Sequence, residues 1–346
     1  MPLAALTGRA AETSMAATIY HIAERAGVSS STVARVLRGD TKGVSPKAAV
    51  RAAKIRKLAE EMGYKRNWRA QAFSRSKTHA VGLFHTHVAW VHEGTMGEVA
   101  GGFAAAMSER GYHVVIVPYD PEGRWCEFLE DGRLDGIAIS HYMPRDAEQA
   151  IAEAALPAVL LVDKSVSEWP AVYTSDRQGA YEATRHLLKL GHRRIAMYLH
   201  DSIRKHFSVE DRHAGYDDAM TEAGLADATE FWHVGEHKLP ELLVGRSDPP
   251  TAVLCYCHVE SMAIYLAAWR LGLRIPADLS VIGFNDLTMT RYMTPPLTTM
   301  GFCTDYIGRV GAELLVQRIE SPESETENVV VHHQLIERLS TGPPRT

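Results

Sequence analysis

The chain has 346 residues, of which 46% are hydrophobic, so it is long enough to bury more than one core. Its net charge of −5 is unevenly divided, because residues 18–79 contain fourteen Lys and Arg against four Asp and Glu, a net charge of +10. Residues 1–17 contain one charge of each sign, so residues 80–346 carry a net charge of −15. A basic module on an acidic body argues against an evenly solvated surface and is typical of polyanion binding by one end.

Cysteine usage and apolar patterning indicate the compartment. The four cysteines follow no disulfide framework, which favours a reduced cytoplasm. No apolar run is long enough to span a membrane, and residues 1–17 lack the charged start and apolar core of a signal peptide. We therefore expect a cytoplasmic protein without a membrane partner, with residues 1–17 as a disordered N-terminal extension. The sequence leaves both Met1 and Met15 as the expected start.

Residues 18–39, TIYHIAERAGVSSSTVARVLRG, predict two short amphipathic helices joined by a turn. Thr18 is placed to cap the first helix, and Gly27 supplies its left-handed end. Ser29 is placed to cap the second helix. The apolar positions are Ile19, Ile22, Ala23 and Ala26 in the first helix and Val33, Val36 and Leu37 in the second.

The outer face of the second helix carries side chains that suit DNA. Ser30, Ser31 and Arg35 are left facing outward, and two hydroxyls with a guanidinium suit base edges and phosphates. A helix-turn-helix places its second helix in the major groove in this way. An ordinary helical hairpin is the alternative, which the basic segments that follow make less favourable.

A third helix and a basic linker follow. Ser45-Pro46 predicts a helix start, and the helix is expected to end at Gly63. Residues 18–63 then form a small all-α DNA-binding headpiece. Residues 64–79, YKRNWRAQAFSRSKTH, are basic with interleaved aromatics, which predicts a hinge or linker that orders against DNA. The candidate buried positions of the third helix are Val50, Ala53, Ile55, Leu58 and Met62.

Residues 80–346 alternate short apolar strands with longer helices, which predicts an α/β domain of two Rossmann-like parallel-sheet subdomains. The N-subdomain is expected at about 80–173 and 301–320, and the C-subdomain at about 174–300 and 321–340. Pro295-Pro296 followed by LTTM indicates a crossover back to the first subdomain. The predicted strands are 81–84, 113–117, 136–139, 158–162, 194–199, 251–256 and 279–284. The predicted helices lie near 97–110, 144–155, 176–190, 210–223, 258–271 and 304–319.

Several stretches, in this order along the chain, resemble the lactose/galactose repressor (LacI-type) family. They are TIYHIAERAGVSSSTVARVLRG, VSPKAAVRAAKIRKLAEEMGY, the linker pattern N-x-x-A-x-x-F, SDRQGAYEATRHLLKLGHRRIA, DRHAGY, RIPADLSVIGFNDL and TPPLTTM. The resemblance implies a homodimeric transcription regulator with a DNA headpiece, a hinge helix and a periplasmic-binding-protein-like effector and dimerisation domain. It also implies a pseudo-palindromic operator.

The resemblance assigns roles to residues of the headpiece and the hinge. Ser30 and Ser31 match positions that read base edges, and Arg35 is the outward arginine of the same helix. Thr32 matches a phosphate-contacting position, with helix packing as its alternative. The other residues matched to phosphate contacts are Tyr20, Ser29 and Asn67, and Gln71 joins the DNA-binding set from the hinge.

The hinge departs from the family pattern at two points. The usual Tyr-x-Pro-Asn is Tyr64-Lys65-Arg66-Asn67 here, without the proline. Phe73 stands where the family usually places a leucine that wedges into the minor groove, and phenylalanine serves as such a wedge elsewhere. The alternative is that Phe73 packs against its own effector domain.

The effector pocket retains some family positions and loses others. Arg212 in DRHAGY matches the arginine that holds the ligand, and Asp163 matches an acid lining the cleft. The family's Asn-Asp pair is Cys257-His258 here, and the first acid of its Gly-Phe-Asp-Asp is Asn285. These changes weaken the expectation of a simple sugar. In the loop after the first strand, His85, His87 and Trp90 replace the usual residues.

The histidines of this pocket admit two interpretations. His85, His87, Cys257 and His258 contain metal-ligating side chains, but their spacing matches no known finger. The favoured interpretation is a polar pocket for an aromatic, nucleoside or acidic ligand, with Trp90 as a stacking platform. We expect neither a resident metal nor a cofactor.

The sequence therefore predicts a ligand-responsive, sequence-specific DNA-binding transcription regulator that acts as a repressor. Activation, or a metal or other non-sugar effector, is the alternative. An enzyme is not expected, because no G-x-G-x-x-G after a strand, phosphate loop or G-x-S-x-G elbow is present. A transport binding protein would need a secretory signal and would have no use for a basic helix-turn-helix.

Overall fold

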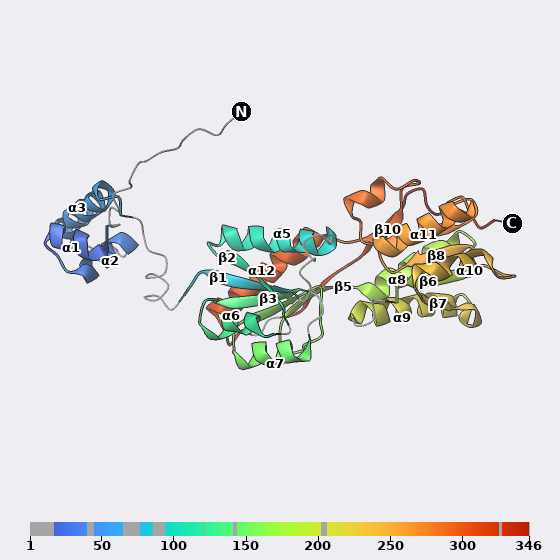
Figure 1. The fold of residues 1–346 in the computed structure, drawn as a ribbon, viewed down its shortest axis with the longest axis horizontal. Coiled ribbons are helices and arrows are strands. Elements are labelled where there is room, and N and C mark those ends of the chain that lie inside the picture. The colour runs from blue at the N-terminus through green and yellow to red at the C-terminus, as the bar shows by residue number, and fades with distance from the viewer. Residues whose placement is uncertain are drawn as a thin grey trace, which may run out of the picture. The chain divides into compact units, whose positions relative to one another are not determined.

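The computed structural model describes residues 17–39, 45–64, 77–85, 94–120, 122–140, 144–201, 206–324 and 327–345. The chain divides into two compact units, Met1–Ser76 and Lys77–Thr346 (Figure 1). Five predicted site residues lie outside the described residues: Asn67, Gln71, Phe73, His87 and Trp90.

The N-terminal unit contains the three predicted helices. They are α1 (Ile19–Ala26), α2 (Ser30–Arg38) and α3 (Pro46–Glu61). One fully buried aliphatic residue from each helix meets the others, namely Ile22, Val33 and Ile55. Because α1 and α2 have only 8 and 9 residues, too few to be stable alone, this shared core holds the unit together.

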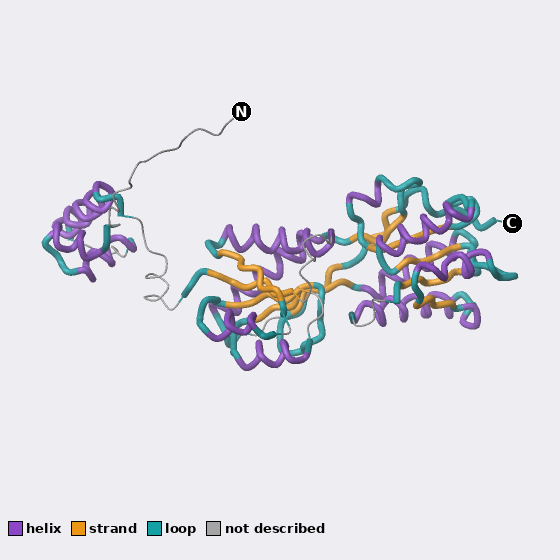
Figure 2. The backbone as a smooth tube through the Cα atoms, viewed as in Figure 1, coloured by secondary structure: helices purple, strands orange, loops and turns teal. Residues whose placement is uncertain are grey.

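The second unit begins with a parallel sheet of six strands among the described residues, in the order β11-β5-β4-β3-β1-β2. Strands are drawn in orange in Figure 2. Helices α5 and α12 cover one face of this sheet, and η2, α6 and α7 cover the other. The strands are β1 (Ala80–His85), β2 (His113–Pro118), β3 (Gly136–Ser140), β4 (Ala158–Leu161), β5 (Ala171–Thr174) and β11 (Val329–Val331). The helices are α5 (Gly94–Glu109), η2 (Arg124–Cys126), α6 (Glu127–Glu130), α7 (Arg145–Glu153) and α12 (Thr304–Glu320). We call this layered part the first lobe.

The second lobe repeats the plan around a sheet whose order is β12-β10-β9-β8-β6-β7 within the described chain. Only β12 is antiparallel, against β10. Helices α8 and α9 cover one face and α10 and α11 the other. The strands are β6 (Ile195–Leu199), β7 (Glu230–His233), β8 (Ala252–Cys255), β9 (Ser280–Phe284), β10 (Thr298–Gly301) and β12 (Gln334–Ile336). The helices are α8 (Asp176–Lys189), α9 (Phe207–Glu222), η3 (Ala226–Ala228), η4 (Glu236–Lys238), α10 (Leu239–Val244), α11 (His258–Leu271) and η5 (Thr288–Arg291).

The chain passes between the lobes after β5, after β10 and after β11, and two of these passages correct the sequence analysis. The predicted crossover to the first lobe occurs after β10, but the strand itself was missed: Thr298–Gly301 forms β10, which pairs in parallel with β9 in the second sheet. The assignment of 321–340 to the second subdomain is wrong for Val329–Val331, three β-branched residues that pair with β5 in the first sheet.

Helices α5 and α12 pack together through glycines in the first lobe. A Cβ on Gly308 would lie 2.1 Å from the carbonyl oxygen of Val99, and one on Gly102 would lie 2.4 Å from that of Asp305. Only glycine permits so close an approach of two helix backbones. Helix α12, which follows a passage between the lobes, is therefore packed closely against α5 of the first lobe.

The helices of the described chain were also compared with what a membrane span requires. None of them is both long enough and apolar enough to cross a bilayer.

Candidate functional site

The predicted caps bound helices α1 and α2 in the N-terminal unit. Thr18 Oγ1 accepts a hydrogen bond from the backbone N–H of His21 (3.4 Å), and Gly27 ends α1 in the left-handed region with φ 66°. Ser29 Oγ accepts one from the backbone N–H of Thr32 (3.3 Å) and so starts α2. Both caps and the left-handed end are confirmed. They set a tight turn between the two helices.

The outward side of α2 is polar, as predicted. Ser31 and Arg35 are exposed and Ser30 is half-buried. Ser29 Oγ also lies 2.9 Å from Ser31 Oγ, so the hydroxyls at the start of α2 are ordered by one another. Tyr20, at the start of α1, is 74% exposed. These side chains are free to meet a ligand outside the unit.

The buried side of α3 differs from the predicted one. Ala52, Ile55 and Ala59 are buried, a stripe with spacings of three and four residues. Val50 and Ala53 are exposed, so their predicted burial is wrong. The error lies in the choice of the buried stripe, because the small side chains of Ala52 and Ala59 allow α3 to lie close to α1 and α2. Leu58 and Met62 pack at the edge of this core.

A cavity of about 620 Å³ lies between the two lobes of the second unit. Its volume is in the range of small-molecule sites. Its described lining from the first lobe and the passages is Gly94, Thr95, Met96, Glu98, Val162, Thr174 and Phe302. Its described lining from the second lobe is Asp176, His206, Ser208, Arg212, Tyr256, Cys257, His258, Val259, Asn285, Leu287, Thr288 and Met289.

A buried ion pair forms the floor of this cavity. Arg212 Nε donates to Asp176 Oδ1 over 2.6 Å, and the two residues are 5% and 1% exposed. The guanidinium lies over the rings of Tyr256 and Phe284, 4.5 and 4.0 Å from their centroids. Burial alone would raise the pKa of Asp176, but Arg212, His333 and the hydroxyl of Thr174 outweigh it and lower that pKa. The pair is charged and rigid.

Two cavity-lining polar atoms have no hydrogen-bond partner among the described residues. They are Thr95 Oγ1, on a residue 7% exposed, and Nδ1 of His258. Burial lowers the pKa of His258, which keeps the imidazole neutral near pH 7. Because buried polar atoms are normally satisfied, both atoms favour a polar ligand in the cavity.

The predicted pocket residues of the second lobe line the cavity. Arg212, Cys257, His258 and Asn285 are all in its wall. Cys257 caps α11, its Sγ accepting the backbone N–H of Val259, and burial raises the pKa of its thiol well above the usual value. This thiol therefore serves the helix cap. That Arg212, Cys257, His258 and Asn285 contact a ligand stays a prediction.

Two predicted pocket residues are placed elsewhere. Asp163 accepts hydrogen bonds from the backbone N–H groups of Lys164 and Ser165 (2.7 and 3.0 Å), so its carboxylate holds a turn and is not among the lining residues. His85 ends β1, which is buried on both faces, and it too is not among the described lining residues. The described chain contains no cluster of three or more metal-ligating His, Cys, Asp or Glu side chains.

The sequence analysis missed five residues that shape the cavity: Thr95, Asp176, His206, Ser208 and Tyr256. Asp176, at the start of α8, was inside a quoted motif, but the strand that precedes it had not been predicted. His206 and Ser208 stand just before DRHAGY, so the neighbourhood of that motif was the available signal.

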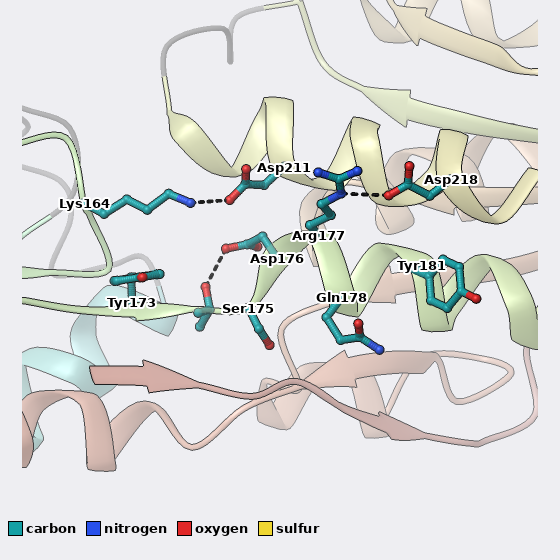
Figure 3. Close-up of a pocket in the computed structure, with 10 residues that line it drawn as sticks. Lys164, Tyr173, Ser175, Asp176, Arg177, Gln178, Tyr181, Asp211 and Asp218 are labelled. Carbon is teal, nitrogen blue, oxygen red and sulfur yellow. Dashed lines mark hydrogen bonds and ion pairs between the residues drawn. The ribbon is translucent and has the colours of Figure 1, made fainter. Parts of the chain in front are cut away.

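A second cavity, of about 430 Å³, opens beside α8 and α9 (Figure 3). Its charges are already paired: Lys164 with Asp211 (2.6 Å) and Arg177 with Asp218 (2.7 Å). Side chains this exposed contribute about 0–1 kcal/mol per pair. With its polar groups satisfied or solvated, this cavity has less need of a ligand than the one between the lobes.

Comparisons with known proteins agree with this architecture. Residues 18–67 match the family described as bacterial regulatory proteins, lacI family, and residues 184–341 match the periplasmic binding protein-like domain. The chain is 30% identical to the HTH-type transcriptional regulator DegA of Bacillus subtilis, over 96% of this chain and 100% of that protein. It is 28% identical to the probable HTH-type transcriptional repressor ExuR of the same species, over 93% and 98%.

Solved structures show the same fold. The lac repressor dimer bound to operator and the anti-inducer ONPF has a TM-score of 0.78 at 22% identity, over 94% of this chain and 99% of that one. The CelR–cellobiose complex has a TM-score of 0.68 at 25% identity, over the same shares. With the helix-turn-helix unit and the two-lobed body, these findings place the chain in the LacI family of bacterial regulatory proteins, as a transcriptional regulator that joins a DNA-binding domain to a periplasmic-binding-protein-like ligand-binding domain.

Proposed function

We propose that this regulator represses transcription by binding a pseudo-palindromic operator as a homodimer, and that a small effector in the cavity between the lobes changes its affinity for DNA. The buried Arg212–Asp176 pair carries this proposal, together with the polar atoms of Thr95 and His258 that have no hydrogen-bond partner in the described part of the chain, because they form a ligand site on the same chain as a helix-turn-helix. We assign the protein no catalytic role and a cytoplasmic location.

The DNA contacts are proposed on α2 and its surroundings. Ser30, Ser31 and Arg35 would meet base edges in the major groove, with Arg35 suited to bidentate contact with guanine. Tyr20, Ser29 and Thr32 would contact phosphates and fix the register. The proposed hinge contacts are those of Asn67, Gln71 and Phe73. The net charge of +10 between residues 18 and 79 supports a strongly salt-dependent affinity.

The homodimer is supported by two apolar surfaces of the second unit. Helix α11 has an outward stripe in which Val259, Leu266 and Trp269 are 49%, 43% and 77% exposed. Strand β2 is the edge of its sheet, and Ile116 on it is 52% exposed. Exposed edges and apolar patches of this kind are normally covered in the working assembly. A second copy of the chain is the proposed cover, by analogy with the lac repressor dimer.

The effector is proposed to be a small polar molecule held by Arg212, His258 and Asn285 at one side and by Thr95 at the other. Relatives have been solved with ribose and with cellobiose bound. Here the residues Met96, Met289 and Phe302 give the cavity apolar walls as well. A nucleoside or a small acid therefore belongs beside sugars among the candidates.

The test separates the two units. Removing residues 1–76 is expected to abolish operator binding. The effector should still raise the melting temperature of the second unit, Lys77–Thr346, which we call the body. The effector is sought by a thermal-shift screen of sugars, nucleosides, acids and divalent metals on the intact chain. Retained operator binding after the truncation would contradict the proposal, and so would a stabilising compound that binds Arg212→Met equally well.

A further inference from the structure

A chain of hydrogen bonds runs from the cavity wall across to the first lobe. The Tyr256 hydroxyl lies 2.6 Å from Ser208 Oγ, and Ser208 Oγ lies 2.6 Å from Nδ1 of His206. Nε2 of His206 lies 2.8 Å from the carbonyl oxygen of Val162. The first three residues belong to the second lobe, whereas Val162 follows β4 in the core of the first. His206 therefore bonds one lobe to the other.

The direction of every bond in this chain is fixed by backbone groups. The carbonyl oxygen of Val162 can only accept, so Nε2 of His206 carries the proton. The backbone N–H of Ser208 donates to Nδ1 of the same ring (3.3 Å), so Nδ1 supplies a lone pair. The imidazole is thus the neutral Nε2–H tautomer. It follows that Ser208 Oγ donates to Nδ1, and that the hydroxyl of Tyr256 donates to Ser208.

This polarity decides what Tyr256 offers to a ligand. Its proton is committed to Ser208, and burial raises the pKa of Tyr256 to about 12, so the proton stays in place at neutral pH. The phenolic oxygen then presents only lone pairs to the cavity that it lines. A ligand hydroxyl or N–H can donate to it without disturbing the chain. A group that only accepts must draw the proton away from Ser208.

The first-lobe end of the chain is held in an unfavourable backbone conformation. Val162 has φ 56°, a left-handed value that β-branched residues rarely adopt. Such conformations persist only where the surroundings impose them. The backbone N–H of Val162 donates to the carbonyl of Val172 (2.7 Å), and Asp163 fixes the following turn. Together these contacts hold the Val162 carbonyl toward His206.

A second contact joins the same two segments. Lys164 Nζ lies 2.6 Å from Oδ2 of Asp211 on α9 (Figure 3). The same Nζ lies 4.6 Å from the centroid of the Phe207 ring, at the start of α9. The turn after β4 therefore grips the first turns of α9 twice, through one buried bond and one partly exposed pair. Of these two contacts, only the buried His206–Val162 bond connects to the cavity between the lobes.

We propose that the His206–Val162 bond is a latch between the lobes, and that the latch senses the cavity through Ser208 and Tyr256. The proposal rests on the proposed function in that the cavity is the effector site. An effector that donates to Tyr256 leaves the latch closed and ties the lobes together. An effector that only accepts there weakens the hold of Ser208 on His206 and releases the first lobe.

The latch is tested on the full-length protein without effector or DNA, by hydrogen–deuterium exchange. His206→Asn keeps a side-chain oxygen to cap α9 but is too short to reach Val162. We expect exchange in residues 158–165, on the other lobe, to become about fivefold faster, the loss of one net hydrogen bond. His213→Asn is the matched control, because His213 lies on the same helix and pairs outward with Asp217. It should leave that segment unchanged.

Unchanged exchange at 158–165 in a folded His206→Asn protein would overturn the proposal, with residues 252–271 as the internal check of folding. If the variant does not fold, nitrogen NMR of histidine in the wild-type protein decides. A slowly exchanging proton on Nε2 of His206 supports the latch, whereas the Nδ1–H tautomer or a rapidly exchanging proton refutes it. Neither measurement involves effector or operator, so a failure of the proposed function would be seen separately.

Discussion

Replacing Arg212 by methionine removes the cation from the floor of the cavity while keeping an unbranched side chain of similar length. In the wild-type protein this guanidinium is 2.6 Å from Asp176, and both residues are almost fully buried. After the change, the Asp176 carboxylate retains the hydroxyl of Thr174 and loses its only buried cationic partner within the described chain. An uncompensated charge is left in the protein interior.

The expected magnitude follows from this geometry. Removing one partner of a buried ion pair costs about 3–5 kcal/mol. In a domain of this size each kcal/mol shifts the melting temperature by roughly 2–4 °C, so we expect a fall of roughly 6–20 °C. Adding Asp176→Asn to Arg212→Met removes the stranded charge and should restore most of that loss. Differential scanning calorimetry of the two single variants and the double variant measures the coupling.

The pH dependence gives an independent check on the same pair. The folded-state pKa of Asp176 is lowered, so the stability it contributes is present above its unfolded pKa of about 3.9 and is lost as the pH falls through the lower folded value. In Arg212→Met, burial is no longer offset by the cation. The penalty should therefore shrink as the pH is lowered from 7 towards 5. An unchanged melting temperature in Arg212→Met, or a double variant no more stable than it, would refute this reasoning.

Three further predictions concern the helices. Arg35→Ala should weaken binding to the cognate operator by about 1–3 kcal/mol and relax its specificity, as measured by fluorescence anisotropy; equal weakening on random DNA would argue against base contact. Gly308→Ala should destabilise the body by about 3 kcal/mol, because its Cβ would meet the carbonyl of Val99. Gly101→Ala, on α5 with open space around it, should be neutral or stabilising in the same denaturant titration, and equal effects would contradict the packing argument. Gly27→Ala should lower the unfolding free energy of the N-terminal unit by about 1 kcal/mol. No atom of the described residues beyond its chain neighbours lies within 4 Å of a Cβ placed there, so only the left-handed backbone conformation opposes alanine. Thermal melting of the wild-type protein and of Gly27→Ala checks this, and equal stability of the two would refute it.

The N-terminal unit was predictable because its signals are local. Caps at Thr18 and Ser29 and the left-handed Gly27 fall within one turn of the helices that they bound. The one local failure was α3, where Ala52 and Ala59 are buried in place of Val50 and Ala53. Side-chain size alone does not indicate which stripe of a helix is buried when close packing favours alanine.

The second unit was predictable where a strand is a continuous apolar run, even in β4 and β8, which have four residues each. The missed strands β5, β7, β10 and β12 contain polar residues, and β11 has only three residues. The motif DRHAGY located Arg212, but its partners Asp176 and Tyr256 are 36 and 44 residues away along the chain. Only the fold of the second lobe brings these residues together. Asp163 was predicted to line the cavity, but its carboxylate instead accepts hydrogen bonds from the backbone N–H groups of Lys164 and Ser165, which follow it directly.

The central claim is that a molecule lodged between the lobes changes the grip of the basic N-terminal unit on DNA. The most direct test measures the operator Kd against salt concentration, with and without a compound that raises the melting temperature of the body. The operator is first captured from genomic DNA by the purified protein. We predict a Kd that weakens as salt rises, shifts about fivefold or more with the compound, and no longer responds to it in Arg212→Met. A body stabilised by the compound with an unchanged Kd, or no fragment preferred over random DNA at any salt concentration, would contradict the account.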